Sequence, residues 1–478
     1  MSVRLQQLYL SSLLLIALSF SACSVVSDGS ISIKLSFPGD NAASTAAAGS
    51  AAETTQPLYT KLPGNRILIR VLAPHIAAPI EAWFDRSAGR GEITGIPPGT
   101  RIAVEVDEYD NTAATLLGRG WAQGIALSAG EHKEVPVIMY DKGAIVRVCG
   151  APPVSGAGTS GDSGDGGLAI DALLDNPLAV KIGPGDEIFV SSSQFNRIRK
   201  IDRYGYISHY AGNGLPGTLT DGQPAATSPI GSVYDLDIGP SGDLFLITGD
   251  QQIVKVDSST GSVTVKYDGQ KGIFNPSAKP DLAVANDNEI YYTNGMESKV
   301  YLVQDNVRSD YVWDNGTSST AEGAFKNTYP LRYPSSVSYN PAVPNLYFAD
   351  RDNGRIKFVA MGIDTIYTKI GKGVSGFSEG IDVDNVALTL PVLCEFHITS
   401  NNLFFRERDF HGIRIVLPTN KVYSFAGMGT AGYSGDGLAA TSAALNNPSA
   451  VAVDSRGNVY IADSGNHALR VVIGGALP

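Results

Sequence analysis

Short apolar runs alternate with short polar breaks through the last part of the chain. Three such runs lie within residues 447–454, 459–463 and 468–472, and each has the length and the β-branched or aromatic content of a strand. The breaks between them carry Gly, Asn, Asp and Ser, which build tight turns. The pattern predicts three consecutive strands joined by turns. Because one such unit leaves both faces of a small sheet uncovered, it needs further copies to pack against.

The same pattern recurs five more times upstream, about once every 50 residues. The upstream copies begin at Pro177, Pro229, Pro276, Pro334 and Pro391. This spacing is typical of four-stranded propeller blades with their loops. The final copy stops after its third strand, but residues 144–150 match the fourth strands predicted at 206–212 and 422–427. We therefore predict an all-β, six-bladed β-propeller over residues 142–478, closed by its N-terminal strand so that no blade edge stays open.

One column of the aligned copies is polar throughout and follows the second predicted strand. It contains Ser192, Thr248, Asn294, Asp350, Glu407 and Asp463. A ligand-binding aspartate would look similar in a single copy, but six polar occupants favour a structural role. We expect these side chains to hold the backbone N–H groups of the next turn.

Two motifs in the last copy point to a known family. Gly-Asn-Val-Tyr-Ile-Ala-Asp at residues 457–463 and Asn-His-Ala-Leu-Arg at 466–470 resemble the NHL-repeat family of β-propellers. The glycine-rich linkers at 161–169 and 429–441 resemble the same family. The resemblance implies an NHL-type propeller. Members and relatives of that fold include RNA-binding proteins, lactonases, lyases and a zinc-dependent amidoglycolate lyase, so the resemblance leaves binding and catalysis both open.

The amino-terminal residues have the features of an export signal. Arg4 precedes an apolar stretch at residues 8–20, and Ser21-Ala22-Cys23 follows. This order resembles a bacterial lipoprotein signal peptide covering residues 1–22. The resemblance implies cleavage before Cys23, diacylation of its sulfur and acylation of the new amino terminus. The alternative is an ordinary secreted protein cleaved at the same small residues.

We therefore predict a protein of the bacterial cell envelope, attached to a membrane by lipid on Cys23, with residues 23–29 as anchor and tether. Ser24 resembles a signal for sorting to the outer membrane. Multiple acyl chains, at about 0.8 kcal/mol per buried CH₂, hold a protein on a membrane essentially permanently. No other stretch of the sequence is apolar for long enough to span a bilayer, so we expect the remainder to be extracytoplasmic.

Residues 30–141 differ from the repeats and predict a separate small domain. Strands are predicted at residues 30–37, 66–71, 91–96, 101–106 and 134–139. Their spacing favours a small antiparallel β-sandwich, and the turn at 95–100 resembles one in prealbumin-like and carboxypeptidase-regulatory-like sandwiches. Residues 41–56 are rich in Ala, Ser and Thr, and we expect them to form a flexible insertion because nothing in them fills a core.

The charge balance narrows the choice of partners. The chain has 36 Lys and Arg against 47 Asp and Glu, which gives a formal net charge of −11. This acidic balance argues against nucleic-acid binding, which depends on a basic face. It also disfavours docking of the folded body onto anionic lipid headgroups.

Catalytic residues of a propeller would lie at the mouth of its central channel, where the inner strands converge. His397, Glu395 and Asp235 lie on predicted inner strands and are the candidate channel residues. A zinc site needs three or four inward ligands at one level, and no other propeller histidine is placed to face the axis. A calcium site is disfavoured because the copies share no acidic pattern. The sequence therefore predicts no metal and no cofactor.

Four single residues also receive an interpretation. Asp165 and Asp436 each precede Gly, and we interpret them as N-caps of helical turns between blades rather than calcium ligands. Cys149 aligns with an outermost strand and Cys394 with an innermost one. We expect both thiols to be buried and unlinked, because opposite ends of a blade exceed the roughly 7 Å that a disulfide spans between Cα atoms.

These observations favour a recognition or scaffold protein over an enzyme. The propeller rim and the inter-blade loops would bind another envelope protein, a peptide or a glycan, because loops carry binding on a rigid frame. The loops in question lie at residues 156–167, 215–227, 317–327, 373–384 and 428–441. The alternative is a hydrolase or lyase, metal-dependent or not, that works at the channel mouth with His397, Glu395 and Asp235.

Overall fold

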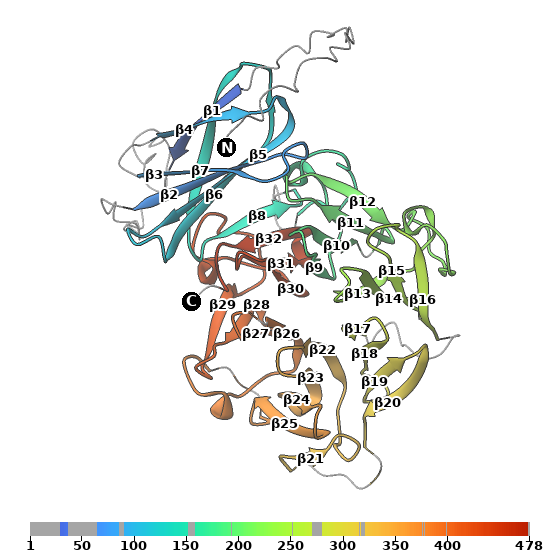
Figure 1. The fold of residues 1–478 in the computed structure, drawn as a ribbon. Coiled ribbons are helices and arrows are strands. Elements are labelled where there is room, and N and C mark those ends of the chain that lie inside the picture. Colours follow the sequence, from blue (N-terminus) through green and yellow to red (C-terminus); the bar gives the residue numbers. More distant parts are fainter. Residues whose placement is uncertain are drawn as a thin grey trace, which may run out of the picture.

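A computed structural model of the chain consists almost entirely of β-strands. It describes residues 29–36, 65–85, 90–151, 158–192, 194–250, 252–269, 280–314, 316, 321–374, 376, 378–397 and 399–476. Six small sheets surround a common centre, and a seventh sheet stands at one edge of the ring (Figure 1). The all-β, six-bladed propeller is therefore confirmed. Cys23 and residues 41–56 lie outside the described residues.

Each blade is one antiparallel sheet whose first strand faces the channel. Blade 1 contains β9 (Val180–Ile182), β10 (Ile188–Ser192), β11 (Arg197–Ile201) and β12 (Ile207–Ala211). Blade 2 contains β13 (Val233–Ile238), β14 (Leu244–Thr248), β15 (Gln252–Val256) and β16 (Val263–Asp268). Blade 3 contains β17 (Leu282–Asn286), β18 (Glu289–Asn294), β19 (Lys299–Gln304) and β20 (Val307–Val312).

The second half of the ring continues the order. Blade 4 contains β22 (Pro334–Asn340), β23 (Asn345–Asp350), β24 (Arg355–Ala360) and β25 (Thr365–Ile370), with the short β21 (Ala324–Phe325) outside β25. Blade 5 contains β26 (Pro391–His397), β27 (Asn402–Glu407), β28 (His411–Val416) and β29 (Val422–Gly429). Blade 6 contains β30 (Ala450–Val453), β31 (Val459–Asp463), β32 (Ala468–Val472) and β8 (Ile145–Cys149).

The ring closes as the repeat pattern predicts. β8 runs antiparallel to β32 and places Ile145 opposite Val472, so the first propeller strand completes the last blade. Apolar side chains of neighbouring blades pack between the sheets. For example, Phe404 of blade 5 and Ile461 of blade 6 share one buried cluster with Ile145. No blade could cover these faces alone, which is why the repeat specifies a ring.

The helical segments are short 3₁₀ turns between strands. They are η2 (Ala169–Asp171), η3 (Ala225–Thr227), η5 (Arg351–Asn353), η6 (Val383–Asn385), η7 (Ala440–Ser442) and η8 (Ser464–Asn466). Within the part of the chain that the structure describes, no helix has the length and apolar character needed to cross a bilayer.

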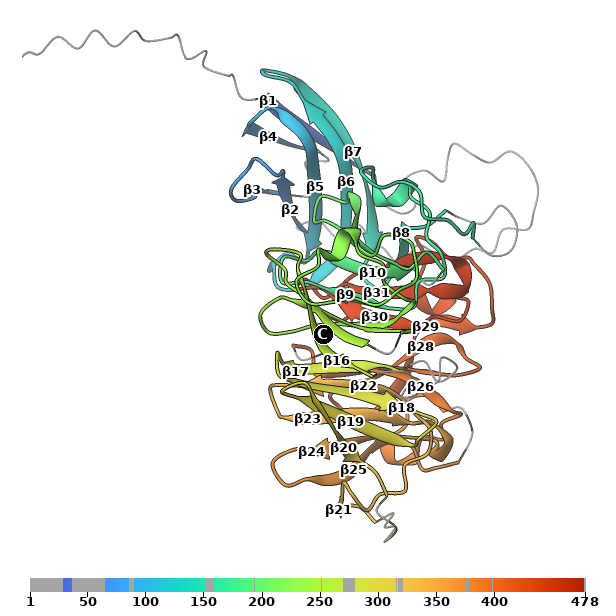
Figure 2. The same ribbon diagram turned by 90° about the vertical axis from the view of Figure 1, so that its right-hand side faces the viewer.

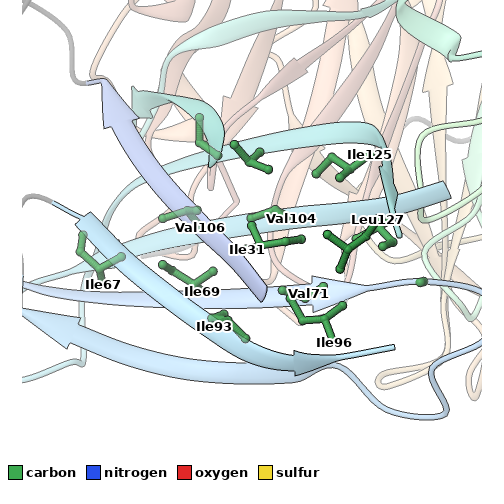
Figure 3. Close-up of a cluster of buried hydrophobic side chains, with 14 of the residues drawn as sticks. Ile31, Ile67, Ile69, Val71, Ile93, Ile96, Val104, Val106, Ile125 and Leu127 are labelled. Atoms are coloured by element: carbon green, nitrogen blue, oxygen red, sulfur yellow. The ribbon is translucent and has the colours of Figure 1, made fainter. Parts of the chain in front are cut away.

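The N-terminal domain differs from the predicted antiparallel sandwich of two layers. Its strands are β1 (Gly29–Ser36), β2 (Arg66–Leu72), β3 (Ile80–Asp85), β4 (Arg90–Ile96), β5 (Gly99–Tyr109), β6 (Leu116–Leu127) and β7 (His132–Asp141). They form one sheet in the order β3-β2-β5-β6-β7-β1-β4, and β1 runs parallel to β7. The sheet curves around a core that includes Ile31, Ile69, Val104 and Leu127 (Figure 3).

β3 and β6 were not predicted from the sequence. β6 contains several glycines, which usually mark turns. At Gly120 the glycine serves close packing instead, because a Cβ atom would stand 2.4 Å from the carbonyl oxygen of Ile138 on β7. Pairing with β5 and β7 therefore stabilises β6 as a strand, although its own glycines have a low strand propensity.

A hydrogen bond and an ion pair join the two domains, which adjoin each other along β8 (Figure 2). Arg119 and Asp107 pair with each other and are almost fully buried. Arg119 also donates a hydrogen bond of 2.7 Å to Asn458 Oδ1 of the propeller. Arg456 of the propeller pairs with Glu105 at 2.5 Å. A cavity of about 580 Å³, the interdomain cavity, lies beside these pairs. The contacts fix the domains relative to one another.

Candidate functional site at the mouth of the central channel

Polar side chains on or beside the inner strands connect blades 2, 3, 4 and 5 in turn. An inner strand has no neighbouring strand on its channel side. The backbone N–H groups on that side therefore need other acceptors. Asp235 Oδ2 on β13 accepts the N–H of Leu282 on β17 at 2.9 Å. Asp237 on the same strand accepts the N–H of Val284 at 2.8 Å. The two carboxylates therefore join blade 2 to blade 3.

The same arrangement continues from blade 3 to blade 5. Asp281, at the start of blade 3, accepts the N–H of Val337 in blade 4 at 2.9 Å. Ser336 Oγ of blade 4 accepts the N–H of Cys394 in blade 5 at 3.0 Å. Ser338 Oγ accepts the N–H of Phe396 at 3.1 Å. Acceptors on the inner strands thus satisfy backbone donors that the blade sheets leave unpaired.

A lysine lies among these carboxylates. Lys181 Nζ on β9 is 2.8 Å from Glu395 on β26 and 3.5 Å from Asp237 on β13. Burial alone would lower the pKa of Lys181, but the charges of Glu395, Asp237 and Asp235 raise it well above its usual value. The lysine therefore stays charged and links blades 1, 2 and 5 across the channel.

Burial changes the protonation of the acidic groups. It raises the pKa of Asp235 to about 7, although Lys181 and two backbone N–H groups act in the opposite direction. Burial also raises the pKa of Glu395, and burial together with the charge of Asp235 raises that of Asp281. The carboxylates repel one another in a poorly solvated channel, so one of them holds a proton more readily than an exposed acid.

A cavity of about 450 Å³, the channel-mouth cavity, opens above this charged cluster. It lies where the inner strands begin, and its deeper wall includes Lys181, Asp235 and Glu395. Its rim carries three guanidinium groups from blades 4 and 5. These rim arginines are Arg351, Arg406 and Arg408. The site therefore combines a basic rim with a deeper wall that is largely acidic.

The structure brings two of the three predicted channel residues together. Asp235 and Glu395 both line the channel-mouth cavity. His397 lies at the opposite end of β26, where its Nδ1 is 2.7 Å from Ser400 Oγ. Burial lowers the pKa of His397, so its imidazole is neutral at pH 7. The histidine does not line the cavity with the two carboxylates.

Lys181 and the rim arginines were missed by sequence reasoning. A charged residue in the middle of the short inner strand at 180–182 was a signal for Lys181. Arg351, Arg406 and Arg408 lie in or beside the turns between second and third strands, where an arginine looks like any exposed charge. These turns come together at one rim only when the blades have assembled into the ring.

Asp165 and Asp436 are not the N-caps that the sequence predicts. The cap positions of η2 and η7 are Leu168 and Ala439, and neither makes a side-chain capping bond. Asp436 instead accepts a hydrogen bond of 2.8 Å from Arg470, whose side chain is fully buried. Asp165 accepts one of 2.7 Å from the equally buried Arg199. The buried guanidinium groups need these carboxylates more than the turns do.

The two pairs fix inter-blade loops that were predicted to form a binding surface. Arg470 also donates to the carbonyl oxygens of Ala444 and Ser434, at 3.1 and 2.9 Å. Arg199 donates in the same way to the carbonyl oxygens of Leu173 and Ser163. These loops are held against the third strands by several charge-assisted bonds, so they act as a rigid part of the frame.

The polar column after the second strands does hold backbone N–H groups. Thr248 Oγ1 accepts from Gln252 in the next turn, as predicted. Asp350 and Asp463 differ, because their carboxylates accept from Arg332 and Asn446 at 2.8 and 2.7 Å. Those N–H groups precede the inner strand of the same blade. These two carboxylates thus bind the backbone just before the inner strands of blades 4 and 6, rather than the turn that follows them.

Two propeller histidines form hydrogen bonds to the backbone, and the two propeller cysteines are buried. The ring nitrogens of His411 and His467 accept backbone N–H groups that lead into the following blades. Cys149 and Cys394 are buried and free. Among the residues that the structure describes, no group of three or more His, Cys, Asp or Glu side chains is placed to hold a metal ion.

Comparison with known proteins identifies one repeat in the chain. Residues 445–472 match the NHL repeat. The match falls on blade 6, whose β31 and β32 carry the motifs noted in the sequence. The chain is 27% identical over 170 residues to the chloroplastic protein SUPPRESSOR OF QUENCHING 1 of Arabidopsis thaliana. That stretch covers 33% of this chain and only 16% of the length of the Arabidopsis protein.

Solved structures resemble the fold at low sequence identity. A Bacteroides thetaiotaomicron protein of unknown function has a TM-score of 0.51 and 11% identity, and the alignment covers 85% of this chain and 90% of that one. An auxiliary nutrient binding protein from Bacteroides ovatus has a TM-score of 0.48 and 16% identity over 86% of this chain and 94% of that one. At these identities the likeness concerns the fold alone.

The acidic cluster gives a pH-dependent prediction. Because the pKa of Asp235 is about 7 when folded and near 3.8 when unfolded, the folded state binds more protons between these values. The contribution of Asp235 to stability should therefore fall as the pH rises from 4 to 7. Asp235→Asn, which keeps an acceptor for Leu282, should be more stable than wild type by about 2 kcal/mol at pH 8 and lose this advantage at pH 4. Thermal unfolding at both pH values measures the difference, and identical pH profiles for the two proteins would contradict it.

Proposed function

We propose that this protein is a lipid-anchored recognition protein of the bacterial cell envelope that binds its ligand at the channel mouth. The observation that carries the proposal is the open channel-mouth cavity with its basic rim and its acidic deeper wall. Concave sites with a few converging polar groups are where rigid folds bind small ligands or the protruding parts of larger ones. The partner would be an envelope protein, a peptide or a glycan.

Binding is favoured over hydrolase or lyase chemistry by the state of the candidate residues. Glu395 is paired with Lys181, and Asp235 holds the backbone of the next blade. A general base must reach substrate with its proton-accepting atoms. His397 lies at the other end of its strand. Asp235 and Glu395 therefore serve as hydrogen-bond and ion-pair acceptors rather than as proton-transferring bases, and His397 lies apart from them.

A pair of matched substitutions tests where the ligand binds. Val392 is half-buried and lines the channel-mouth cavity, so Val392→Trp should fill part of it. Val343 is 60% exposed in the turn between β22 and β23, at the opposite face, so Val343→Trp is the control. Ligands found on glycan and peptide arrays would be remeasured by calorimetry. We expect Val392→Trp to weaken binding at least tenfold and Val343→Trp to leave it unchanged.

Two results would contradict the proposal. Equal affinity of wild type and Val392→Trp would place binding elsewhere on the molecule. Failure of the wild-type protein to bind any ligand on either array would argue against a recognition role. Thermal unfolding of both variants shows whether each one is folded when it is measured.

A further inference from the structure

Arg406 is held at the channel mouth with part of its hydrogen-bonding capacity unused. Its Nη1 donates to Asn447 Oδ1 at 2.9 Å and to the carbonyl oxygen of Arg408 at 3.2 Å. Its Nε is buried and has no partner among the described groups. Burial lowers the pKa of Arg406 to about 10, with the charge of Asp409 acting in the opposite direction. The guanidinium is still charged at pH 7 and lacks a full set of acceptors.

The two other rim arginines are oriented differently but are also available. The guanidinium of Arg351 stacks on the ring of Tyr333 at 3.5 Å, and its Nε donates to Asp352 at 2.8 Å. Stacking holds a guanidinium in one plane while its Nη atoms remain free to donate. Arg408 is exposed, and its side chain forms no ion pair within the described residues. Three guanidinium groups from the neighbouring blades 4 and 5 thus lie at one opening, and among the described residues Asp352 is the only carboxylate that forms an ion pair with them.

Such a rim fits a carboxylate. Arginine binds planar oxyanions through two parallel N–H···O bonds, which a carboxylate accepts on its two oxygens. The deeper wall presents the carboxylates of Asp235, Asp281 and Glu395, which accept hydrogen bonds from hydroxyl groups. Tyr234, Tyr333 and Ser335 also line the cavity. A ligand that matches the whole cavity carries a carboxylate and several hydroxyl groups.

An acidic peptide fits less well. An extended peptide binds a sheet edge through free backbone groups. On the inner strands, the N–H groups of Leu282, Val337 and Cys394 are already bonded to side chains of the preceding blade. A polyhydroxylated ring, with its apolar face toward a tyrosine, uses the available groups better.

We propose that Arg351, Arg406 and Arg408 bind the carboxylate of an acidic sugar, a uronic acid residue of a glycan, at the channel mouth. This inference rests on the proposed recognition function and specifies its ligand class. The hydroxyl groups of the sugar donate to the deeper carboxylates, while the rim arginines bind the carboxylate of the sugar. The cavity of about 450 Å³ is within the size range of small-ligand sites.

Calorimetric titration of the full chain tests the assignment with defined probes. The probes are three uronate trisaccharides of different hydroxyl configuration (galacturonate, mannuronate and guluronate), the neutral maltotriose, and triglutamate. At least one uronate trisaccharide should bind, and maltotriose should bind at least tenfold more weakly. Arg406→Gln and Arg408→Gln should each weaken uronate binding about tenfold. Arg203→Gln is the control, because Arg203 is exposed on the β11–β12 turn, away from the channel mouth.

Every alternative outcome overturns the assignment, and each one identifies the part that is wrong. Binding of triglutamate without binding of any uronate would make the ligand an acidic peptide. If uronate binding is unchanged in both Arg406→Gln and Arg408→Gln but lost in Val392→Trp, the channel mouth is the site but the arginines do not bind the sugar. If no uronate binds while a neutral glycan from the array does, recognition stands and the acidic sugar is wrong. Because Arg408 is exposed, Arg408→Gln stays informative even if Arg406→Gln does not fold.

Discussion

Arg470→Met is expected to lower the free energy of unfolding by about 3–5 kcal/mol, the usual cost of breaking a buried charged pair. The Arg470 side chain is 0% exposed on β32. It donates to Asp436 and to the carbonyl oxygens of Ala444 and Ser434. Methionine keeps much of the apolar stem but leaves these acceptors without a donor, which is more costly than losing the bonds alone. The loop between blades 5 and 6 should also become more mobile, because it loses the hydrogen bonds from Arg470.

Urea unfolding followed by circular dichroism measures this effect. Arg203→Met is the matched control, because Arg203 is exposed, and a surface substitution of this kind usually changes stability by less than about 0.5 kcal/mol. Asp436→Asn should cost less than Arg470→Met, since the amide oxygen still accepts a bond from the guanidinium. If Arg470→Met is no more destabilising than Arg203→Met, the buried arginine is not what fixes the loop.

Cys23→Ser is expected to abolish lipid modification and to release the protein from the membrane fraction. The thioether to the diacylglycerol requires the sulfur of Cys23, which a serine hydroxyl does not replace. Each acyl chain contributes about 0.8 kcal/mol per CH₂ that it buries, and two or more chains anchor a protein stably where one does not. The acidic balance of the chain gives the folded body no compensating attraction to anionic lipid.

Metabolic labelling with an alkyne-bearing palmitate, followed by fractionation of the cells, measures this change. Wild type should carry the label and sediment with membranes, and Cys23→Ser should do neither. Cys149→Ala is the matched control, because alanine occupies the equivalent position of β12 and β29 at Ala211 and Ala426. An unlabelled, soluble wild-type protein would instead support the ordinary secreted form cleaved near Ala22.

The sequence predicts the propeller well because its information is local and repeated. Six copies of one strand pattern indicate six blades, and residues 144–150 resemble other fourth strands closely enough to reveal the seam at β8. The N-terminal sheet is harder to predict from the sequence, because pairing with the neighbouring strands stabilises the glycine-rich β6. Its parallel pair, β1 with β7, joins segments about 100 residues apart that carry no signal of their partnership.

The candidate site could also be predicted only in part, because its residues come from segments that are far apart in the sequence. Asp235 and Glu395 were identified because they are charged residues on predicted inner strands. The partner that decides their chemistry, Lys181, comes from another blade, and the distance between these groups exists only once the ring has closed. The rim arginines lie beside turns, where a sequence pattern does not distinguish a solvated charge from a ligand-binding one.

The most direct test of binding at the channel mouth is a crystal structure of the protein grown with the uronate trisaccharide that binds best. Density for the sugar is expected in the channel-mouth cavity, with its carboxylate against Arg406 and its hydroxyl groups toward Asp281 and Glu395. Sugar density confined to the interdomain cavity or to the outer loops would contradict recognition at this site.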